Sequence, residues 1–299
     1  MLLLYQKRRL SDISVCQNKQ LRYNNNMFDP KNNKFPYPAD TAGHYLEVKM
    51  DRGIVFDKDY PYVDYSKGFA FKRFWVRLLL RLIVFPMSLI RMGIRIKGKE
   101  NLRNNKKIIS QGAITIANHV HMWDYICVMK ALHNYKWPYL LSWDKNVNGD
   151  SGPLVRMVGG IPIPEHDNLA TVSFLKATKK LLADGNFLHI YPEGSMWEYY
   201  APIRPFKNGA ASFAIKNNKP IIPMAFTYRK PNWIRRKIFK QIALFTLHIG
   251  EPLFANPDLQ QSAQIDDLTT RAHQEMCRLA GQRHNIYSPI YNNSKRIDY

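Results

Sequence analysis

From residue 94 onward, short runs of β-forming residues alternate with longer amphipathic stretches, and this alternation constrains the fold more than any other feature of the sequence. The runs typical of strands cover residues 113–117, 139–143, 160–163, 187–191, 220–226 and 242–249. The stretches typical of helices cover residues 124–133, 168–183, 210–217 and about 262–280. Strands that alternate with helices predict an α/β fold with a mixed, mostly parallel sheet flanked by helices. A sheet of this kind binds its ligand at the carboxyl ends of the strands.

The most hydrophobic part of the chain, residues 71–98, is the candidate for a membrane segment. The run without charge between Arg81 and Arg91 has nine residues, whereas a helix needs roughly 20 to cross a bilayer. Arg77 and Arg81 lie one helical turn apart, aromatic and leucine side chains cover much of the remaining surface, and Pro86 is expected to kink or end the first helix. This pattern predicts an N-terminal amphipathic helical segment that docks on a membrane, with its arginines at the lipid phosphates. A helix packed on the domain, with solvated arginines, is the alternative.

The chain is strongly basic. Its 44 lysines and arginines against 23 acidic residues give a formal net charge of +21, which favours anionic partners such as an anionic membrane surface, an acidic protein or nucleic acid. Residues 228–241 concentrate basic side chains around Trp233 and Phe239, a composition typical of a surface that contacts anionic lipid, with a solvated loop as the alternative. The three cysteines form neither a disulfide framework nor a metal-binding pair, and the N-terminus shows no export signal. We therefore expect a protein at the cytoplasmic face of the membrane, peripheral or monotopic.

Two histidines and an aspartate follow the expected strand 113–117 in the sequence ANHVHMWDY, residues 117–125. A histidine just past a strand end is suited to general base catalysis, because its usual pKa of about 6.5 leaves it mostly neutral at pH 7. A carboxylate bonded to the other ring nitrogen fixes the tautomer and stabilises the imidazolium. His119 lies five residues before Asp124 and His121 lies three before it, so regular helical geometry favours His121. His119 reaches Asp124 only from a loop before the helix, and the spacing alone leaves the choice of base open.

Asn118 and His119 are followed, after four residues, by Asp124. This pattern resembles the first sequence block of the glycerolipid acyltransferase family, whose familiar member is lysophosphatidic acid acyltransferase (1-acylglycerol-3-phosphate O-acyltransferase). Similar counterparts of the other family blocks follow in the same order: GGIPIPE at 159–165, YPEGS at 191–195 with PFKNGA at 205–210, and KPIIPMAF at 219–226. The resemblance covers about residues 94–252. Four blocks in order are a far more specific signal than a single HxxxxD pattern.

The resemblance implies a reaction and a set of site residues. His119 takes the proton from an acceptor hydroxyl, which attacks the carbonyl of an acyl thioester, and Asp124 orients His119. The family's chemistry needs no metal, no cofactor beyond the acyl donor and no covalent enzyme intermediate. The resemblance also places Glu193, Gly194 and Ser195 at the acceptor.

This chain departs from the family where the acceptor's phosphate is expected to bind. Met196 and Trp197 stand where the third block usually continues with an arginine, and Glu165 and His166 stand near the usual arginine at the end of the second block. A guanidinium is the expected bidentate partner of a phosphate. Either Arg204 and Lys207 reach the phosphate instead, or the acceptor is not a simple lysophosphatidate. A solvated surface lysine is the alternative for Lys207, and Trp197 with the tyrosines that follow it would suit a sugar acceptor or would pack as ordinary aromatic residues.

These features divide the chain into an irregular N-terminal arm at 1–70, amphipathic membrane-interface helices at 71–97, an acyltransferase domain at 98–285 and a C-terminal tail at 286–299. The leading function is a membrane-associated O-acyltransferase of phospholipid biosynthesis. It moves an acyl chain from acyl-CoA or acyl carrier protein to the hydroxyl of a lysophospholipid, with 1-acylglycerol-3-phosphate as the first candidate acceptor.

Other functions explain less of the sequence. A glycolipid or sugar acceptor would keep the same chemistry. A basic nucleic-acid-binding protein would leave the four blocks unexplained, so no specific nucleic acid partner is expected. A metal-dependent hydrolase that used His119, His121 and Asp124 as ligands would crowd them into six residues, which makes a poor metal site.

Overall fold

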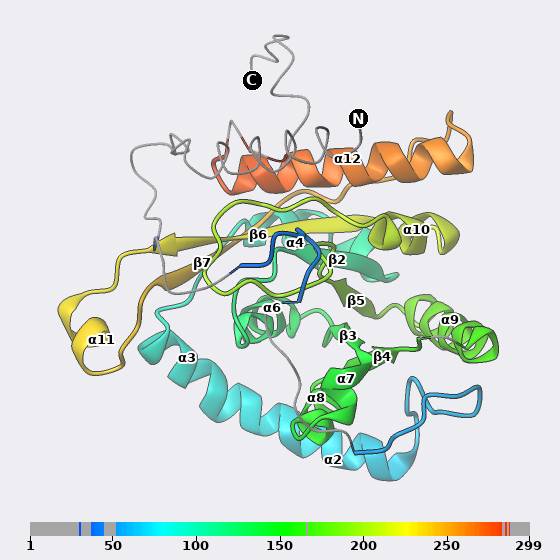
Figure 1. Cartoon of the computed structure of the whole chain (residues 1–299), viewed down its shortest axis with the longest axis horizontal. Coiled ribbons are helices and arrows are strands. Elements are labelled where there is room, and N and C mark those ends of the chain that lie inside the picture. The colour runs from blue at the N-terminus through cyan, green and yellow to red at the C-terminus, as the bar shows by residue number, and fades with distance from the viewer. Residues whose placement is uncertain are drawn as a thin grey trace, which may run out of the picture.

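The computed structural model describes residues 30, 37–44, 52–165, 167–282, 285 and 287, which form an α/β domain around one sheet (Figure 1). Its seven strands lie in the order β1-β7-β6-β2-β5-β3-β4. The strands are β1 (Arg95–Lys97), β2 (Ala113–Ala117), β3 (Tyr139–Trp143), β4 (Gly160–Ile163), β5 (Phe187–Ile190), β6 (Ile221–Arg229) and β7 (Leu244–Ile249). The strands from β6 to β4 in this order run parallel, whereas β7 is antiparallel to β6 and pairs in parallel with β1 at the edge. The predicted mixed, mostly parallel sheet is confirmed.

Helices connect the strands and cover the sheet. They are α2 (Lys67–Leu79), the π-helical turn η1 (Leu80–Val84), α3 (Phe85–Arg91), α4 (Lys99–Asn104), α5 (Lys106–Ile109), α6 (Asp124–Leu132), α7 (Asp144–Asn148), α8 (Gly152–Met157), α9 (Asn168–Ala183), α10 (Gly209–Lys216), α11 (Trp233–Lys237) and α12 (Gln261–Leu279). The Asp167 carboxylate caps α9 by accepting from the amides of Leu169 and Ala170, and Gly185, at φ +76°, follows its end. Both signals are in the sequence, so the bounds of α9 agree with the prediction.

The bounds of β2, β3 and β4 also agree with the prediction, and the other predicted elements are present with shifted ends. β6 runs past residue 226 to Arg229, because its last residues continue to pair with β7. The prediction missed β1 and the helices α4, α5, α7, α8 and α11, none of which exceeds six residues. Elements this short contain too few residues for a hydrophobic period to show.

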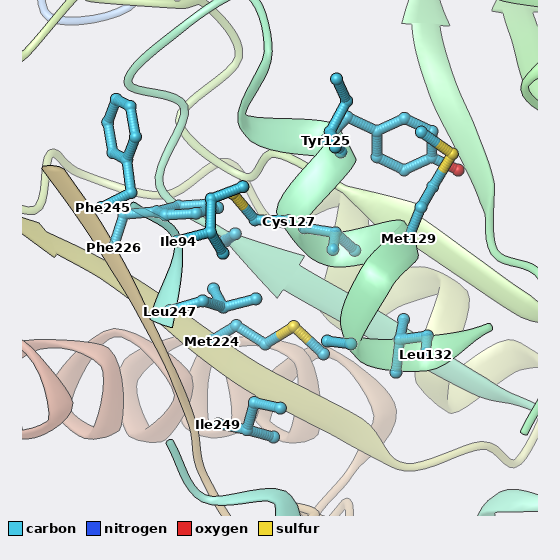
Figure 2. Packing of buried hydrophobic residues seen from close by; sticks show 14 of the residues in the cluster. Ile94, Tyr125, Cys127, Met129, Leu132, Met224, Phe226, Phe245, Leu247 and Ile249 are labelled. Atoms are coloured by element: carbon cyan, nitrogen blue, oxygen red, sulfur yellow. The ribbon is translucent and has the colours of Figure 1, made fainter. Parts of the chain in front are cut away.

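The central strands bury apolar side chains on both faces, as expected for parallel strands covered by helices. Figure 2 shows one core, in which side chains of α6 meet those of β6 and β7; the labelled residues are Ile94, Tyr125, Cys127, Met129, Leu132, Met224, Phe226, Phe245, Leu247 and Ile249. The other core joins the sheet to α9, α10 and α12 and includes Ile114, Ile116, Phe174, Leu182, Ala211 and Met276. Each fully buried aliphatic or aromatic side chain contributes about 1.5–3 kcal/mol. This packing fixes the strand ends and the start of α6, which carry the candidate site.

The predicted amphipathic segment is one continuous run of helix along one side of the domain (Figure 1). α2 passes through η1 into α3, and the amide of Phe85 donates to the carbonyl of Leu80, the hydrogen bond of a π-helix. Pro86 was predicted to kink or end the helix; it lies in the first turn of α3 and does not end the helix. The π-helical turn directly before Pro86 changes the hydrogen-bond pattern where the proline lacks an amide proton. Among the described residues, no helix is long and apolar enough to cross a membrane.

The first arginines of this segment face the domain. Arg73 Nη1 donates to the hydroxyl of Tyr139 at 2.7 Å, and the Arg77 guanidinium lies 5.2 Å from the ring centroid of Trp137. Burial, with a smaller contribution from the charge of Arg73, lowers the pKa of Arg77. The prediction that the arginines point to lipid phosphates is therefore wrong for Arg77, because its guanidinium gains an aromatic partner in the domain. The exposed side instead carries Phe71, Phe74, Trp75, Leu79, Leu82, Ile83, Met87 and Ile90.

The described part of the predicted N-terminal arm packs on the domain, although it contains no helix or strand before α2. Tyr62 is buried in the core, and Arg156 Nη1 donates to its carbonyl at 2.8 Å. Residues 37–44 lie against the loop that follows β5. The remainder of the predicted arm, and all of the predicted C-terminal tail except Tyr287, fall outside the described residues.

Candidate active site

His119, Asp124 and Tyr191 come together at the carboxyl ends of β2 and β5, which are neighbours in the sheet. His119 lies in the loop after β2, Asp124 begins α6, and Tyr191 follows β5 directly. β2 and β5 pair in parallel with Ile116 opposite Ile190, so the segments that follow the two strands emerge side by side. The fold thereby joins two sequence blocks that are far apart along the chain.

The carboxylate of Asp124 is the centre of this arrangement. Its Oδ2 lies 2.8 Å from His119 Nδ1 and accepts the amides of Val120 at 2.9 Å and His121 at 3.2 Å. Its Oδ1 accepts the hydroxyl of Tyr191 at 2.5 Å. Burial would raise the pKa of Asp124, but the charge of His119 and these hydrogen bonds together hold it below its usual value. Asp124 is therefore an ionised carboxylate at neutral pH.

The ionised Asp124 fixes the tautomer of His119. A carboxylate only accepts hydrogen bonds, so Nδ1 carries the proton and Nε2 presents its lone pair. The side chain of His119 is 25% exposed and that of Asp124 is 1% exposed. This geometry suits a base at Nε2 that takes a proton from a hydroxyl, with a buried carboxylate that stabilises the resulting imidazolium.

His121 is close in sequence but makes different contacts. Its Nδ1 accepts the amide of Trp123 at 3.1 Å, and its Nε2 lies 3.5 Å from the carboxylate of Glu198. Burial is the main cause that lowers the pKa of His121. The helical argument that favoured His121 fails because residues 118–123 precede the helix. Among the residues that the structure describes, no group of three or more His, Cys, Asp and Glu side chains is placed to hold a metal ion.

Tyr191 is a site residue that the sequence analysis missed. Its ring stacks on the imidazole of His119, with centroids 3.8 Å apart and an interplanar angle of 9°, while its hydroxyl donates to Asp124. Burial, and then the charge of Asp124, raises the pKa of Tyr191 well above its usual value, so the hydroxyl keeps its proton. The available signal was its place as the first residue of YPEGS, directly past a strand.

Glu193 and Arg204 form a buried ion pair beside the catalytic loop. Arg204 Nη2 lies 2.9 Å from Glu193 Oε2, and the side chains are 1% and 2% exposed, respectively. Arg204 Nη1 also donates to Ser195 Oγ at 2.9 Å and to the Thr41 carbonyl at 2.7 Å. Burial raises the pKa of Glu193, although the charge of Arg204 opposes the shift. These contacts turn the polar groups of Glu193, Ser195 and Arg204, all expected at the acceptor, toward the protein interior.

A comparison of the sequence with family models matches one part of the chain. Residues 93–227 match the family described as Acyltransferase, and this range contains His119, Asp124, Tyr191 and Glu193. The chain contains an acyltransferase domain. Among solved structures, it is similar to the 1-acyl-sn-glycerophosphate (LPA) acyltransferase PlsC from Thermotoga maritima, with 15% identity, a TM-score of 0.44, and coverage of 72% of this chain and 84% of that one. The search of curated proteins finds no match.

In this acyltransferase, Gly194 and Lys207 are the exposed members of the predicted acceptor group. Gly194 has φ +81°, and a Cβ added to it would lie 2.8 Å from Cε and 2.9 Å from Nζ of Lys207. The side chain of Lys207 therefore lies directly across Gly194, and a larger residue at position 194 would displace the lysine. The amide of Lys207 donates to the Pro192 carbonyl at 2.8 Å, which holds the lysine beside the turn.

Further basic side chains of the acyltransferase lie near this turn. The ring of His44 stacks on Trp143 with centroids 4.0 Å apart, and Lys145 Nζ lies 4.8 Å from the same indole. Burial, followed by the charges of Lys207 and Lys145, lowers the pKa of His44, while Glu165 opposes the shift. Positive charge therefore gathers around His44, although the sequence analysis did not connect this residue with the site.

The aromatic residues after the turn are packed inside. Trp197 is 3% exposed, its Nε1 donates to the Gly43 carbonyl at 3.0 Å, and its ring stacks on Tyr37. Tyr199 is buried against Phe245, with ring centroids 5.8 Å apart. These side chains do not present an open stacking face to a sugar, so the feature that suggested a sugar acceptor has a packing role in the acyltransferase.

Proposed function

We propose that this acyltransferase transfers an acyl chain to a hydroxyl of a glycerolipid, with His119 as the general base. Nε2 of His119 takes the proton from the hydroxyl as its oxygen bonds to the carbonyl carbon of an acyl thioester. The C–S bond then breaks, and the departing thiolate takes the proton from the imidazolium, which leaves an ester and a free thiol. General base catalysis of this kind contributes about 10² to 10⁴ in rate.

The observation that supports this proposal most directly is the contact between His119 Nδ1 and the buried carboxylate of Asp124 at 2.8 Å. Because Nδ1 holds the proton, Nε2 is the basic nitrogen, and the partial exposure of the ring lets an acceptor approach it. The proposed mechanism uses no metal ion and no cofactor beyond the acyl donor. Acyl-CoA and acyl carrier protein are both acidic, and the net charge of +21 favours an encounter with either.

We propose a lysophospholipid as acceptor, first 1-acylglycerol-3-phosphate, a substrate of phospholipid biosynthesis. Lys207 supports a phosphate next to the site because its ammonium group lies across Gly194, a short distance along the chain from Tyr191. Lys145, which like Lys207 acts on the pKa of His44, adds positive charge near Lys207. Arg204, the other predicted phosphate ligand, is not part of this proposal, since its guanidinium is buried and hydrogen bonded to protein groups.

The proposed place of action is the cytoplasmic face of a membrane, where the protein binds as a peripheral or monotopic enzyme. Support comes from an exposed surface formed by the outer side of α2 to α3 together with α11, which we call the α2–α11 surface. It carries Leu82 and Trp233, which are 64% and 65% exposed. Arg235 Nε donates to the carbonyl of Ile90 at 2.9 Å and so joins α11 to α3, which lie together in Figure 1. Apolar and aromatic side chains next to the basic residues of α11 suit an interface with anionic lipid.

The direct test is acyl transfer with a panel of donors and acceptors. Labelled acyl-CoA and acyl carrier protein would each be offered with 1-acylglycerol-3-phosphate, a lysoglycolipid and a free sugar. The variants are His119→Ala and, as a matched control from the same loop, His121→Ala. We expect transfer to 1-acylglycerol-3-phosphate that is lost by at least about 10²-fold in His119→Ala and retained in His121→Ala.

The alternatives give different results in the same assay. Transfer only to the lysoglycolipid or the sugar would be compatible with His119 as the general base and would reject 1-acylglycerol-3-phosphate as the acceptor. Equal activity in the two variants, or transfer to none of the acceptors, would reject His119 as the base of this reaction.

A further inference from the structure

The buried ion pair of Glu193 and Arg204 has no role in the mechanism above. Removing two charges from water is expensive, and a buried ion pair is weak evidence for stability by itself. The five donors of a guanidinium form a rigid fork, and here the fork is occupied by protein groups. Arg204 contacts Glu193 Oε2, Ser195 Oγ, the Ser195 carbonyl and the Thr41 carbonyl. Its guanidinium also lies 4.4 Å from the ring centroid of Trp197.

The pair acts directly on the main chain of His119. Glu193 Oε2, the same oxygen that accepts from Arg204, accepts the amide of His119 at 3.1 Å. The carbonyl of His119 accepts the amide of Trp197 at 3.0 Å, and the carbonyl of Val120 accepts the amide of Tyr199 at 2.8 Å. Both sides of the His119 peptide are therefore bonded to the segment from Glu193 to Tyr199, and Arg204 holds the first part of that segment through Glu193 and Ser195.

Residues outside the matched acyltransferase region complete this support. The match covers residues 93–227, whereas the partners in residues 37–44 precede it. The Thr41 carbonyl accepts from Arg204 at 2.7 Å and the Gly43 carbonyl accepts from Trp197 Nε1 at 3.0 Å. Tyr37 stacks on Trp197 with ring centroids 5.2 Å apart, and its hydroxyl donates to the Glu198 carbonyl at 2.6 Å.

We propose that Arg204 is a positioning residue for His119 and that it acts through Glu193. Residues 37–44, which precede the matched region, hold Arg204 and Trp197 in place and so belong to the catalytic apparatus. The inference rests on the proposed function, because it concerns the position of the base. Since a displacement of about 1 Å in a catalytic group costs on the order of 10²-fold in rate, a loosened His119 peptide lowers kcat without weakening the binding of substrate.

The test separates positioning from stability by comparing Arg204→Met with the double variant Glu193→Gln/Arg204→Met. Arg204→Met leaves a buried carboxylate without its partner, so both Tm and kcat fall. The double variant removes both charges, so Tm recovers toward the wild type. We expect kcat of the double variant to stay about 10²-fold below the wild type with an unchanged KM. Arg278→Met, which removes an exposed guanidinium paired with Glu275 on α12, is the matched control and keeps full activity.

Recovery of kcat together with Tm in the double variant would overturn the proposal, because the pair would then act on stability alone. Arg204→Lys covers the case in which a charge-deleting variant does not fold. It keeps the charge and lacks the fork, and we expect a folded enzyme with kcat lowered about tenfold and an unchanged KM. Wild-type kcat in Arg204→Lys would likewise reject the role.

The contribution of residues 37–44 has its own variant, Tyr37→Ala, which removes the stack on Trp197 and the bond to the Glu198 carbonyl. A fall in kcat of about tenfold at unchanged KM supports the proposal, and wild-type kcat rejects the part of it that concerns these residues. Failure of this inference is distinguishable from failure of the proposed function. If His119→Ala is inactive while the Arg204 variants keep wild-type kcat, only the inference fails, whereas an active His119→Ala removes the basis of both.

Discussion

The ring of Tyr191 lies parallel to the imidazole of His119, with centroids 3.8 Å apart, and its hydroxyl donates to Asp124 at 2.5 Å. One side chain thus contacts both members of the proposed catalytic pair. Tyr191→Phe keeps the ring and removes the hydroxyl, so the pKa of Asp124 rises because the carboxylate loses a hydrogen bond that favours its charged form. We expect kcat to fall about tenfold while the KM for the acceptor is unchanged.

Initial rates with the preferred acceptor would measure this effect. Tyr65→Phe is a matched control, because it removes a hydroxyl that lies 3.5 Å from the Asp184 carboxylate at an exposed site on the domain. Loss of activity in both variants, or in neither, would contradict the role assigned to the hydroxyl of Tyr191.

The lowered pKa of Asp124 has a consequence for stability at acid pH. A carboxyl group with a depressed pKa in the folded state stabilises the fold above its unfolded pKa of about 3.9, and the contribution is lost as the pH falls through the folded value. Asp124→Asn removes this contribution and lowers the free energy of unfolding by about 1.5–3 kcal/mol at pH 7, the range for hydrogen bonds to a charged group. The difference between the wild type and Asp124→Asn shrinks below about pH 4.

Urea unfolding of the two proteins between pH 7 and pH 3 would check this expectation. Glu193 does not produce the same trend, because its pKa is raised and its contribution is therefore lost as the pH rises. A difference between the two proteins that stays constant over the whole range would show that the charge of Asp124 contributes nothing to folding.

Much of the fold could be predicted from local signals in the sequence. The strands at the site, β2 and β5, are short and mostly apolar with several β-branched residues, and α9 carries a cap at Asp167 and a stop at Gly185. The short helices α7, α8 and α11 span less than two turns, so they show no period. The direction of Arg77 was also hidden, since the ring that it faces, Trp137, follows a different helix.

The site was predictable only in part, because it too depends on contacts between segments that are distant in the sequence. The spacing between the two histidines and Asp124 left His119 and His121 open, and the loop at 118–123 decides which imidazole meets the carboxylate. The burial of Arg204 depends on carbonyl groups in residues 37–44, which are distant in sequence and have no regular secondary structure. No pattern in the sequence connects such segments, because their contact arises from the tertiary fold alone.

The proposed docking of the α2–α11 surface on a membrane predicts which side chains contribute to lipid binding. Trp233→Ser/Ile238→Ser removes two exposed apolar side chains, one from α11 and one from the residue that directly follows it. Each contributes about 1.5–3 kcal/mol if it is fully buried in the membrane. We expect binding to vesicles that contain phosphatidylserine to weaken at least tenfold, and wild-type binding to decrease with added salt because basic residues contribute.

Vesicle sedimentation at two salt concentrations would measure this. Leu169→Ser/Val172→Ser is the matched control, since these side chains of α9 are also exposed but lie outside the α2–α11 surface. Equal weakening in both double variants would show that binding depends on general hydrophobicity and would contradict a specific docking surface.

The position of Lys207 across Gly194 predicts a selective effect on the acceptor. Lys207→Met removes the charge and keeps the length of the side chain, so the affinity for a phosphate-bearing acceptor falls while the proton transfer at His119 is unaffected. We expect the KM for 1-acylglycerol-3-phosphate to rise about tenfold with little change in kcat, and Lys207→Arg to restore most of the affinity. Lys216→Met, on the exposed side of α10, is the control and leaves the KM unchanged. A lysoglycolipid acceptor gives the decisive comparison. If its KM rises in Lys207→Met as much as that of the phosphate acceptor, the lysine shapes the site without binding the phosphate, and the phosphate must be held by other groups.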